Sequence, residues 1–306
     1  MKLFFLFLSL LTLPSYASFT DEDLKILIKQ SELKDSDVLM VWKDGKLLHS
    51  KNRDNTKQYS IQSVTKSLTA LTTSCILRDR PEQLDEPNLF RSWENSPKIK
   101  ICLRMLLSMT SGMKDPGDPW GNNDFYRHAA KQPLTYTPGT RFSYANISPM
   151  IVGKWIKETT GHQFSHHIQE CMFGAMDITN WRIGKDREGN EVVAGGMRIL
   201  AQDLLKVGIM LVQDGVYDGQ ELYSFDQIQE LRKDKLADRT SYGLSFWLNG
   251  NNLYYAAGHL GQYLVMVPSE KLVVLRLRNP KSMRSSKINN VNWFKELPGL
   301  ISRLIK

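Results

Sequence analysis

The chain has 306 residues, a formal net charge of +8 and 24% charged residues, which allows one large domain or two fused lobes with a substantial core. The Lys and Arg residues are spread along the chain without a basic run, and no RNA- or DNA-binding motif is present. The composition therefore argues against a nucleic-acid-binding protein, and the charge is expected to favour solubility and contact with an anionic cell envelope.

The N-terminus, MKLFFLFLSLLTLPSYAS, has the features of an export signal. One Lys precedes an apolar run, and the small residues Ser15 and Ala17 stand at positions −3 and −1 of a cut after Ala17. This pattern predicts a secretory signal peptide over residues 1–17 and a mature chain, residues 18–306, that is periplasmic or secreted. An uncleaved anchor is the alternative. No later segment has the roughly 18 apolar residues of a transmembrane helix, so we expect no stable membrane insertion after cleavage.

The chain contains three cysteines, Cys75, Cys102 and Cys171. They are too few for a scaffold built on disulfides, and their spacing matches no metal-ligand pattern. One bridge can form in an oxidising compartment, with one thiol left over. Cys75 occupies an apolar helix position, so a buried and unbridged cysteine is the alternative there.

The sequence of the first quarter of the chain predicts a helix, then a β-hairpin and then a second helix. Residues 21–33 are expected to be helical, and the apolar runs on either side of the Asp-Gly pair at residues 44–45 predict a β-hairpin. After a strand-like run, residues 64–77 place apolar side chains on one face of an amphipathic helix that begins at Ser63.

The remainder divides into a helical middle and a strand-rich end. Residues 81–181 mix helical and loop signals, residues 200–212 predict an amphipathic helix, and strands are expected in YGLSFWLNG, NNLYYAAGH, GQYLVMVP and KLVVLRLR before a final helix. Strands at both ends predict an α/β (α+β) fold with one antiparallel sheet built from both termini and flanked by helices. The α/β lobe is expected over residues 18–80 and 182–306, with the helical lobe, residues 81–181, inserted.

The segment SIQSVTKSLT places Ser63 and Lys66 three positions apart at the start of the second helix. Residues i and i+3 share a helix face, so the Lys66 amine can lie over the Ser63 hydroxyl. The positive end of the helix dipole and the free N–H groups of the first turn favour an alkoxide and an oxyanion there. Burial in this environment would lower the pKa of Lys66 and make it a better base.

A Ser-x-x-Lys match alone is weak evidence. Ser31 with Lys34 and Ser111 with Lys114 also fit it, but the first pair flanks a helix end and the second runs into a Pro/Gly loop. For the pair at residues 63–66, the alternative is a helix N-cap serine beside a solvated lysine.

Two further motifs follow in the chain, Tyr144-Ala-Asn146 and His259-Leu-Gly261. In this order the three motifs resemble the β-lactamase-like serine hydrolase family, the fold of class C β-lactamases, serine D-Ala-D-Ala carboxypeptidases and related esterases and amidases. The segments LLSMTSGM, PGTRFSYAN, GGMRILAQDLLKVGIMLVQDG and GQYLVMVP extend the resemblance over about residues 37–280. Within the family, the sequence is most similar to 6-aminohexanoate-dimer hydrolases and carboxylesterases.

The resemblance implies a role for each residue of the first two motifs. Ser63 would be the acylated nucleophile, and Lys66 and Tyr144 would share its proton and later protonate the leaving group. Either Lys66 or Tyr144 can be the base for acylation. Asn146 would position Lys66 and a substrate amide or ester.

For the third motif, the resemblance implies a substrate-binding strand. His259 would occupy its first position, the backbone N–H groups of Ser63 and Gln262 would form the oxyanion hole, and Gly258 and Gly261 would let a substrate approach the backbone of an edge strand.

The third motif departs from the Lys-Thr-Gly of β-lactamases and many carboxypeptidases. His259 carries a full charge only below about pH 6.5 unless its pKa is shifted, and Leu260 has no hydroxyl, so a permanent carboxylate clamp is missing. This departure disfavours β-lactam hydrolysis and D-Ala-D-Ala cleavage and favours other esters and amides. A second departure, Leu200 where the family has Ser or Thr, affects only a helix cap.

Histidines and aromatic residues also occur outside the three motifs. His162 and His166 could bind a metal with His167 if helical, but Gly161 and a helix start near residue 165 put His162 outside the helix, so we expect solvated histidines and no metal site. His49 and His128 have no evident partner. Two roles are possible for Trp120, Phe125 and Tyr126. They either contact an apolar acyl or leaving group of the substrate or only pack within the protein. These three aromatic residues lie in or beside a Pro/Gly/Asn loop.

The sequence thus predicts an exported, cofactor-independent serine hydrolase that forms an acyl-enzyme on Ser63 with a small-molecule ester or amide. A penicillin-binding D-amino-peptide hydrolase or weak β-lactamase is the alternative within the enzyme class, and a non-catalytic penicillin-binding-like envelope module is the alternative outside it. Nothing in the sequence predicts the oligomeric state or the physiological substrate.

Overall fold

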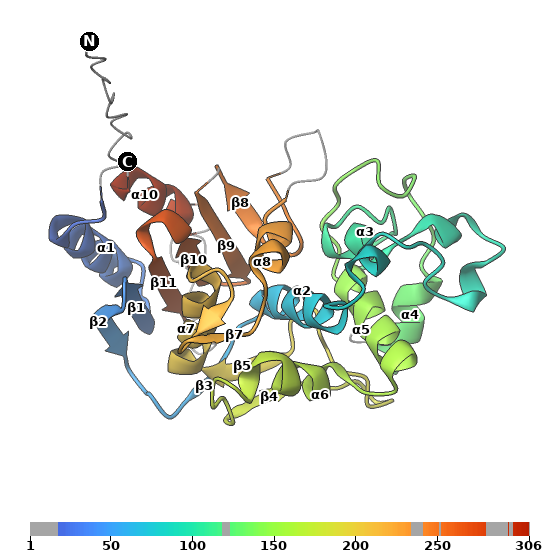
Figure 1. The fold of residues 1–306 in the computed structure, drawn as a ribbon, viewed down its shortest axis with the longest axis horizontal. Coiled ribbons are helices and arrows are strands. Elements are labelled where there is room, and N and C mark those ends of the chain that lie inside the picture. The colour runs from blue at the N-terminus through green and yellow to red at the C-terminus, as the bar shows by residue number, and fades with distance from the viewer. Residues whose placement is uncertain are drawn as a thin grey trace, which may run out of the picture.

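Figure 1 shows the computed structural model of the chain. It describes residues 18–117, 123–233, 241–250, 252–279, 293 and 296–305. The expected signal peptide and Trp120 lie outside these residues. No helix among the described residues is long and apolar enough to cross a membrane.

Strands from both termini form one six-stranded antiparallel sheet in the order β2-β1-β11-β10-β9-β8. The prediction of a single sheet from the two ends, with helices on it, is confirmed. The Asp-Gly pair at residues 44–45 turns the first hairpin as expected. The strands are β1 Val38–Lys43, β2 Lys46–Asn52, β8 Trp247–Asn249, β9 Leu253–Gly258, β10 Gln262–Val267 and β11 Leu272–Leu277.

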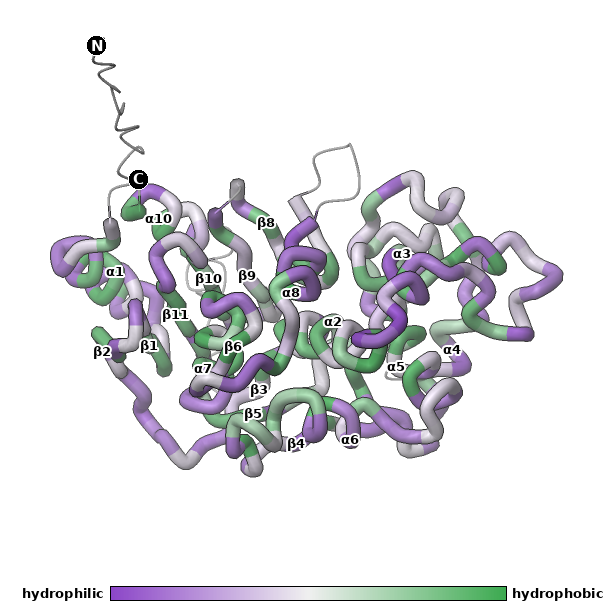
Figure 2. Tube along the Cα trace, viewed as in Figure 1, coloured by the Kyte–Doolittle hydropathy of each residue, from purple (hydrophilic) through white to green (hydrophobic). Residues whose placement is uncertain are grey.

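Helices cover both faces of this sheet. Alternate residues of a strand point to opposite faces, so Leu39 and Val41 join one hydrophobic cluster while Val38 and Met40 join the other. The smaller cluster packs under α1 (Asp21–Leu33) and α10 (Glu296–Leu304), and the larger under α2 (Val64–Ile76) and α7 (Ala201–Val212). Hydrophobic residues concentrate on these inner strands and helices, and hydrophilic residues on the outer loops (Figure 2).

Helix α2 lies in the middle of the molecule, between the sheet and the helices α5 and α6 (Figure 1). Every residue from Val64 to Thr73 is buried, including five Ser or Thr residues. Several of these hydroxyls bond to helix carbonyls: Thr72 Oγ1 donates to Leu68 O at 2.9 Å. Because buried hydroxyls satisfied in this way cost little, a polar helix can occupy the core. Its N-terminus thereby reaches the centre of the structure.

The chain between the sheet strands is largely helical, as predicted. A second, three-stranded sheet in the order β3-β5-β4 lies below α2. Strands β4 and β5 were not predicted, because runs of three or four residues give too short a pattern to separate from the helix that follows. The elements here are β3 Gln58–Ser60, α3 Leu103–Leu107, α4 Phe125–Lys131, α5 Ile147–Thr160, α6 Phe164–Ile168, a π-helical segment η4 Gln169–Phe173, β4 Trp181–Ile183 and β5 Met197–Leu200. The other elements among the described residues are short. They are the 3-10 helices η1 Pro81–Leu84, η2 Arg91–Trp93, η3 Pro97–Lys100 and η5 Pro268–Glu270, the hairpin of β6 Val216–Tyr217 and β7 Gln220–Glu221, and the helix α8 Phe225–Leu231.

A disulfide joins Cys75 near the end of α2 to Cys171 in η4. The bridge closes a separation of 96 positions in the sequence. Cys102 is free and buried. The alternative of an unbridged Cys75 is therefore wrong, and the leftover thiol is Cys102.

Candidate active site

The turn into α2 fixes the direction of Ser63. Strand β3 ends at Ser60, and Gln62 then takes a left-handed backbone conformation with φ 53°. This conformation costs a non-glycine residue about 1–2 kcal/mol. Ser63 occupies the N-cap position of α2, yet its side chain makes no capping hydrogen bond. The interpretation of Ser63 as a helix cap is therefore wrong, and its hydroxyl is available for another partner.

That partner is Lys66. The Lys66 Nζ atom lies 2.8 Å from Ser63 Oγ, 3.0 Å from Asn146 Oδ1 and 2.6 Å from the Ala194 carbonyl oxygen. Lys66 is 1% exposed, so the alternative of a solvated lysine is wrong. Burial lowers the pKa of Lys66 to about 7, although the negative charge of Asp115 opposes the shift.

These three contacts suit the amine in either protonation state, and as an ammonium ion Lys66 donates to all three oxygens. A neutral amine has two N–H groups and one lone pair. Asn146 Oδ1 and the Ala194 carbonyl are acceptors and can take the two N–H groups. The lone pair then faces Ser63 Oγ, which can donate its proton. The arrangement provides a base beside a potential nucleophile.

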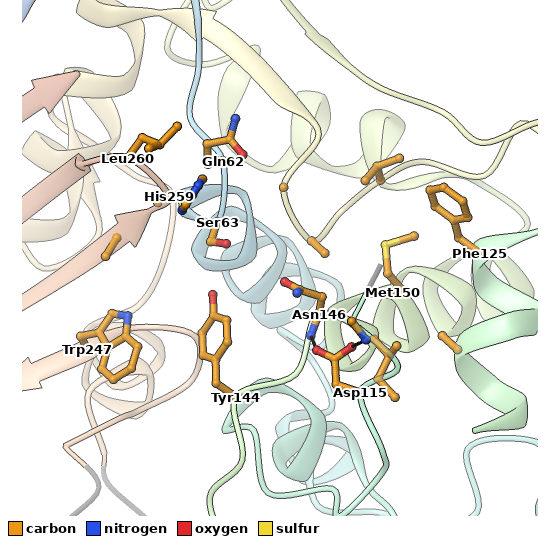
Figure 3. A pocket seen from close by; sticks show the side chains of 18 of the residues that line it. Gln62, Ser63, Asp115, Phe125, Tyr144, Asn146, Met150, Trp247, His259 and Leu260 are labelled. Atoms are coloured by element: carbon orange, nitrogen blue, oxygen red, sulfur yellow. Dashed lines mark hydrogen bonds between the residues drawn. The ribbon is translucent and has the colours of Figure 1, made fainter. Parts of the chain in front are cut away.

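Tyr144 completes the group from the opposite side. Its hydroxyl points toward Ser63 (Figure 3), and its ring centroid lies 5.2 Å from Lys66 Nζ. Burial raises the pKa of Tyr144, and a hydrogen bond with the Ser63 side chain offsets part of the rise. The ring stacks on Trp247 at a centroid distance of 5.9 Å and an interplanar angle of 16°. Tyr144 is therefore held as a neutral phenol within reach of Ser63.

Asn146 links this group to a residue that the sequence analysis missed. It stands at the N-terminus of α5, and its side chain bonds to Lys66 instead of capping the helix. Its backbone N–H donates to Asp115 Oδ2 at 2.6 Å. Asp115 lies in a Pro/Gly loop directly after Lys114. Lys114 belongs to the Ser-x-x-Lys match at residues 111–114, which was set aside, and this neighbourhood is the one sequence feature that could have pointed to Asp115. The Ala194 carbonyl is main chain and leaves no trace in the sequence.

The third motif forms the turn between β9 and β10. Leu260 and Gly261 both have positive φ, at 63° and 84°. Gly258, the last residue of β9, packs so closely on the segment before Ser63 that a Cβ there would lie 2.3 Å from the Ile61 carbonyl oxygen. Any side chain at position 258 would therefore push β9 away from the N-terminus of α2. His259 follows it, exposed, beside Ser63 (Figure 3).

One expectation about this motif needs correction. The strand is not an edge strand, because β9 lies between β10 and β8, although β8 pairs only as far as Tyr255. Gln262 is fully buried, and its side-chain Oε1 accepts the backbone N–H of Arg278 at 3.0 Å. Gln262 pairs with Gly258 across the turn, and the role expected of its backbone N–H stays a prediction.

A cavity of about 970 Å³ opens beside Ser63 and Tyr144. Phe125 lines the cavity, which agrees with the alternative that it contacts the substrate. Tyr126 is buried away from the cavity and packs against Gly153, which agrees with the alternative of plain packing. His128, for which no role was evident, also lines the wall. The apolar part of the wall consists of Phe125, Ala129, Ile147, Met150, Val192, Ala194, Trp247, Ala257 and Leu260.

The cavity has few charged groups. Its described lining contains no Lys or Arg side chain, and Asp115 is the one acidic residue there. No group of three His, Cys, Asp or Glu side chains among the described residues converges on it. The site therefore offers a nucleophile, a base and an acid next to a mostly apolar chamber, with no set of metal ligands in the part of the chain that the structure describes.

A family model described as Beta-lactamase matches residues 31–293. The chain belongs to the beta-lactamase family.

Several solved structures have the same beta-lactamase fold as this chain, although their sequence identity to it is low. A Bacillus anthracis protein classed provisionally as a 6-aminohexanoate-dimer hydrolase is similar with a TM-score of 0.76 and 18% identity, covering 92% of this chain and 83% of its own. A penicillin-binding protein from Bacillus halodurans has a TM-score of 0.67 and 17% identity, covering 88% and 99%. A class C beta-lactamase from Rhodobacter sphaeroides has a TM-score of 0.67 and 17% identity, covering 92% and 100%.

Proposed function

We propose that this protein is a serine hydrolase that forms an acyl-enzyme on Ser63 with a small-molecule ester or amide. The observation that carries the proposal is the buried Lys66 amine 2.8 Å from Ser63 Oγ, with its other two contacts to oxygen acceptors. Because burial lowers the pKa of Lys66 to about 7, a large fraction of the protein holds the neutral amine at neutral pH.

In the acylation step, Lys66 takes the proton of Ser63 while Oγ bonds to the substrate carbonyl carbon. The carbonyl π electrons move to oxygen and form a tetrahedral oxyanion. As the oxyanion collapses, the bond to the leaving group breaks, and the alcohol or amine leaves with a proton delivered through Tyr144, which Lys66 resupplies. The acyl group remains on Ser63 until water, deprotonated by the same groups, releases the acid and restores the serine.

The oxyanion requires two backbone donors. The Ser63 N–H lies at the N-terminus of α2, where the helix dipole favours negative charge. For the second donor we infer the N–H of His259, because His259 lines the cavity beside Ser63; the Gln262 N–H expected from the sequence is the alternative. Gly258 supports this assignment, since its missing side chain lets the end of β9 approach residues 61–62.

The chamber favours substrates without a carboxylate. Its described lining has no Lys or Arg to pair with one, and the Asp115 carboxylate would repel it. Apolar side chains from α4 and α5 instead suit the aliphatic part of an acyl or leaving group. These features favour neutral esters and small amides.

Two alternative functions can be distinguished from this proposal by one labelling assay. The likeness to a penicillin-binding protein and a class C beta-lactamase supports a D-amino-peptide hydrolase or weak β-lactamase as the second candidate. A non-catalytic penicillin-binding-like envelope module is the third, but the contact of Lys66 with Ser63 and of Ser63 with Tyr144 argues against lost turnover.

An exported location is part of the proposal. The sequence of residues 1–17 motivates it, and the Cys75–Cys171 bridge supports it, because disulfides persist in oxidising compartments.

A labelling assay with two substrates tests the function. The purified protein is treated with a fluorophosphonate and assayed with p-nitrophenyl butyrate and nitrocefin, beside Ser63→Ala as the control. Labelling with ester turnover, both abolished by the substitution, is the expected result. Nitrocefin turnover would favour the second candidate, and absence of labelling in the folded protein would overturn the enzyme assignment.

A further inference from the structure

A second cluster of chemically active side chains lies at the junction of α5 and α6. Three of the six histidines of the chain, His162, His166 and His167, meet there with Glu170. The rings of His162 and His166 stack at a centroid distance of 4.1 Å, and those of His166 and His167 lie 5.1 Å apart. Glu170 Oε2 lies 3.2 Å from His166 Nε2.

The backbone explains why these residues meet. Helix α5 ends with Gly161 in a left-handed conformation, φ 76°, and α6 begins at Phe164, so the chain turns back within three residues. His162 precedes α6, as the sequence predicted, but the tight turn keeps its ring over the first turn of that helix. His166 and Glu170 are four positions apart in continuous helical structure and share a face. Leaving the helix therefore does not remove His162 from the cluster.

The chemistry of the four side chains suits a transition-metal ion. Imidazole nitrogens and carboxylate oxygens are the ligands that Zn²⁺ takes at about 2.0–2.2 Å. The ligand atoms of His166, His167 and Glu170 already lie within 4.8 Å of one another. Ligands of one ion must be closer than about 4.4 Å, so small side-chain rotations suffice. His166 and Glu170 are 40% and 64% exposed, which leaves room for them.

One further feature favours metal binding over a set of unconnected surface side chains. His167 Nε2 forms a 2.8 Å hydrogen bond with Thr160 Oγ1, which holds this ring beside the others.

We propose that His162, His166, His167 and Glu170 form a binding site for a divalent late first-row transition metal, with Zn²⁺ as the probe. The ion would tie the C-terminal end of α5 to α6 and η4. The site is separate from the catalytic centre. Glu170 adjoins Cys171, whose partner Cys75 lies twelve positions, or about 18 Å of helix, beyond Ser63 on α2. Its role is therefore stabilisation of the fold.

Zinc titration tests the site. The purified protein is treated with EDTA and titrated with Zn²⁺ by isothermal calorimetry, and its thermal midpoint is measured with and without Zn²⁺. We expect binding of one ion per chain and a higher midpoint with the metal. His166→Ala is expected to weaken this binding by at least about 100-fold, because it removes a ligand, and to abolish the rise in midpoint.

The control is His49→Ala on β2, which removes a histidine outside the cluster and should bind Zn²⁺ like the unmodified protein. Because His166 is at the surface, its substitution should leave the metal-free midpoint unchanged. Histidine ring NMR spectra provide a second measurement, with zinc-dependent shifts expected for His162, His166 and His167. Equal zinc affinity of the unmodified protein and His166→Ala, or shifts confined to other histidines, would overturn the proposal.

Discussion

The Asp115 carboxylate accepts the backbone N–H of Asn146 at 2.6 Å, directly in front of the helix that presents Asn146 to Lys66. This contact gives Asp115 two effects on the same amine. It holds the Asn146 segment in position, and its negative charge raises the pKa of Lys66 against the larger lowering by burial. Asp115 is therefore a positioning residue that also sets the pH at which the base becomes available.

Asp115→Asn should shift the pH dependence of the enzyme. The substitution removes the charge, so the pKa of Lys66 should fall further, while the amide oxygen can still accept the Asn146 N–H. We expect the acidic limb of the kcat/KM profile for p-nitrophenyl butyrate to move to lower pH.

Asp124→Asn is the matched control, because Asp124 caps α4 through the Arg127 N–H and asparagine can do the same. Its pH profile should be that of the unmodified protein. An acidic limb that stays in place or moves upward in Asp115→Asn would contradict the assignment of Lys66 as the base.

Tyr144→Phe should separate the phenol from the aromatic platform. The substitution removes the hydroxyl that bonds to Ser63 but keeps a ring to stack on Trp247. Loss of a positioned proton donor typically costs about 10²- to 10⁴-fold in rate, so kcat should fall by that order with little change in KM. Tyr255→Phe removes a hydroxyl from another tyrosine that stacks with Trp247 and should leave kcat unchanged. An unchanged kcat in Tyr144→Phe, or a similar loss in both variants, would contradict the role of the Tyr144 hydroxyl as the proton donor.

The sequence predicted α2 and the terminal strands because both rest on local patterns. The apolar periodicity after Ser63 and the Asp-Gly turn at residues 44–45 are readable over a few positions. The pairing of β1 with β11 joins residues more than 200 positions apart, and the sequence predicted only that strands from the two ends share one sheet. The short strands β4 and β5 were not predicted, because pairing with neighbouring strands and not their own residue pattern determines them.

The candidate site divides in the same way. Ser63, Lys66, Tyr144 and Asn146 were found from motifs, and the structure brings their side chains together. Contacts made by main-chain atoms have no residue type that a sequence could reveal.

Ala129→Leu should narrow the apolar chamber and change the preference for acyl length. Ala129 is 1% exposed and lines the cavity on α4. A larger side chain there should obstruct long acyl groups while leaving the space next to Ser63 open. We expect kcat/KM for p-nitrophenyl octanoate to fall at least about tenfold relative to the acetate ester. An equal effect on both esters, in a variant that melts like the unmodified protein, would place the acyl group elsewhere.

The disulfide predicts a thiol count and a stability change. With Cys75 bonded to Cys171 and Cys102 free, the unreduced, denatured protein should react with one equivalent of Ellman's reagent, and the reduced protein with three. Opening a loop closed across 96 positions should destabilise the fold by about 4 kcal/mol. Cys75→Ser should reproduce this loss in a urea titration, whereas Cys102→Ser should leave the effect of reduction intact. Three reactive thiols before reduction would refute the pairing.

Lys66→Met should make the fold more stable at neutral pH while abolishing turnover. In the unfolded chain the lysine returns to an ordinary pKa near 10.4, whereas burial lowers its pKa to about 7 in the folded protein. Between these values the unfolded state binds the extra proton, so the unfolding free energy of the unmodified protein should rise with pH. From pH 7 to pH 9 the rise from this one group amounts to about 2 kcal/mol.

Methionine does not titrate, so urea unfolding of Lys66→Met should lack this contribution, and its unfolding free energy should change by about 2 kcal/mol less than that of the unmodified protein between the two pH values. The range stops at pH 9 because burial raises the pKa of Tyr254, and its unfolded-state ionisation near pH 10 would act in the opposite direction. Lys154→Met, at a lysine on α5 that pairs with Glu158, is the control and should show the full pH dependence. Identical pH dependence in Lys66→Met and the unmodified protein would mean that Lys66 is charged in the folded state at pH 9, and the neutral-amine mechanism would then lose its base.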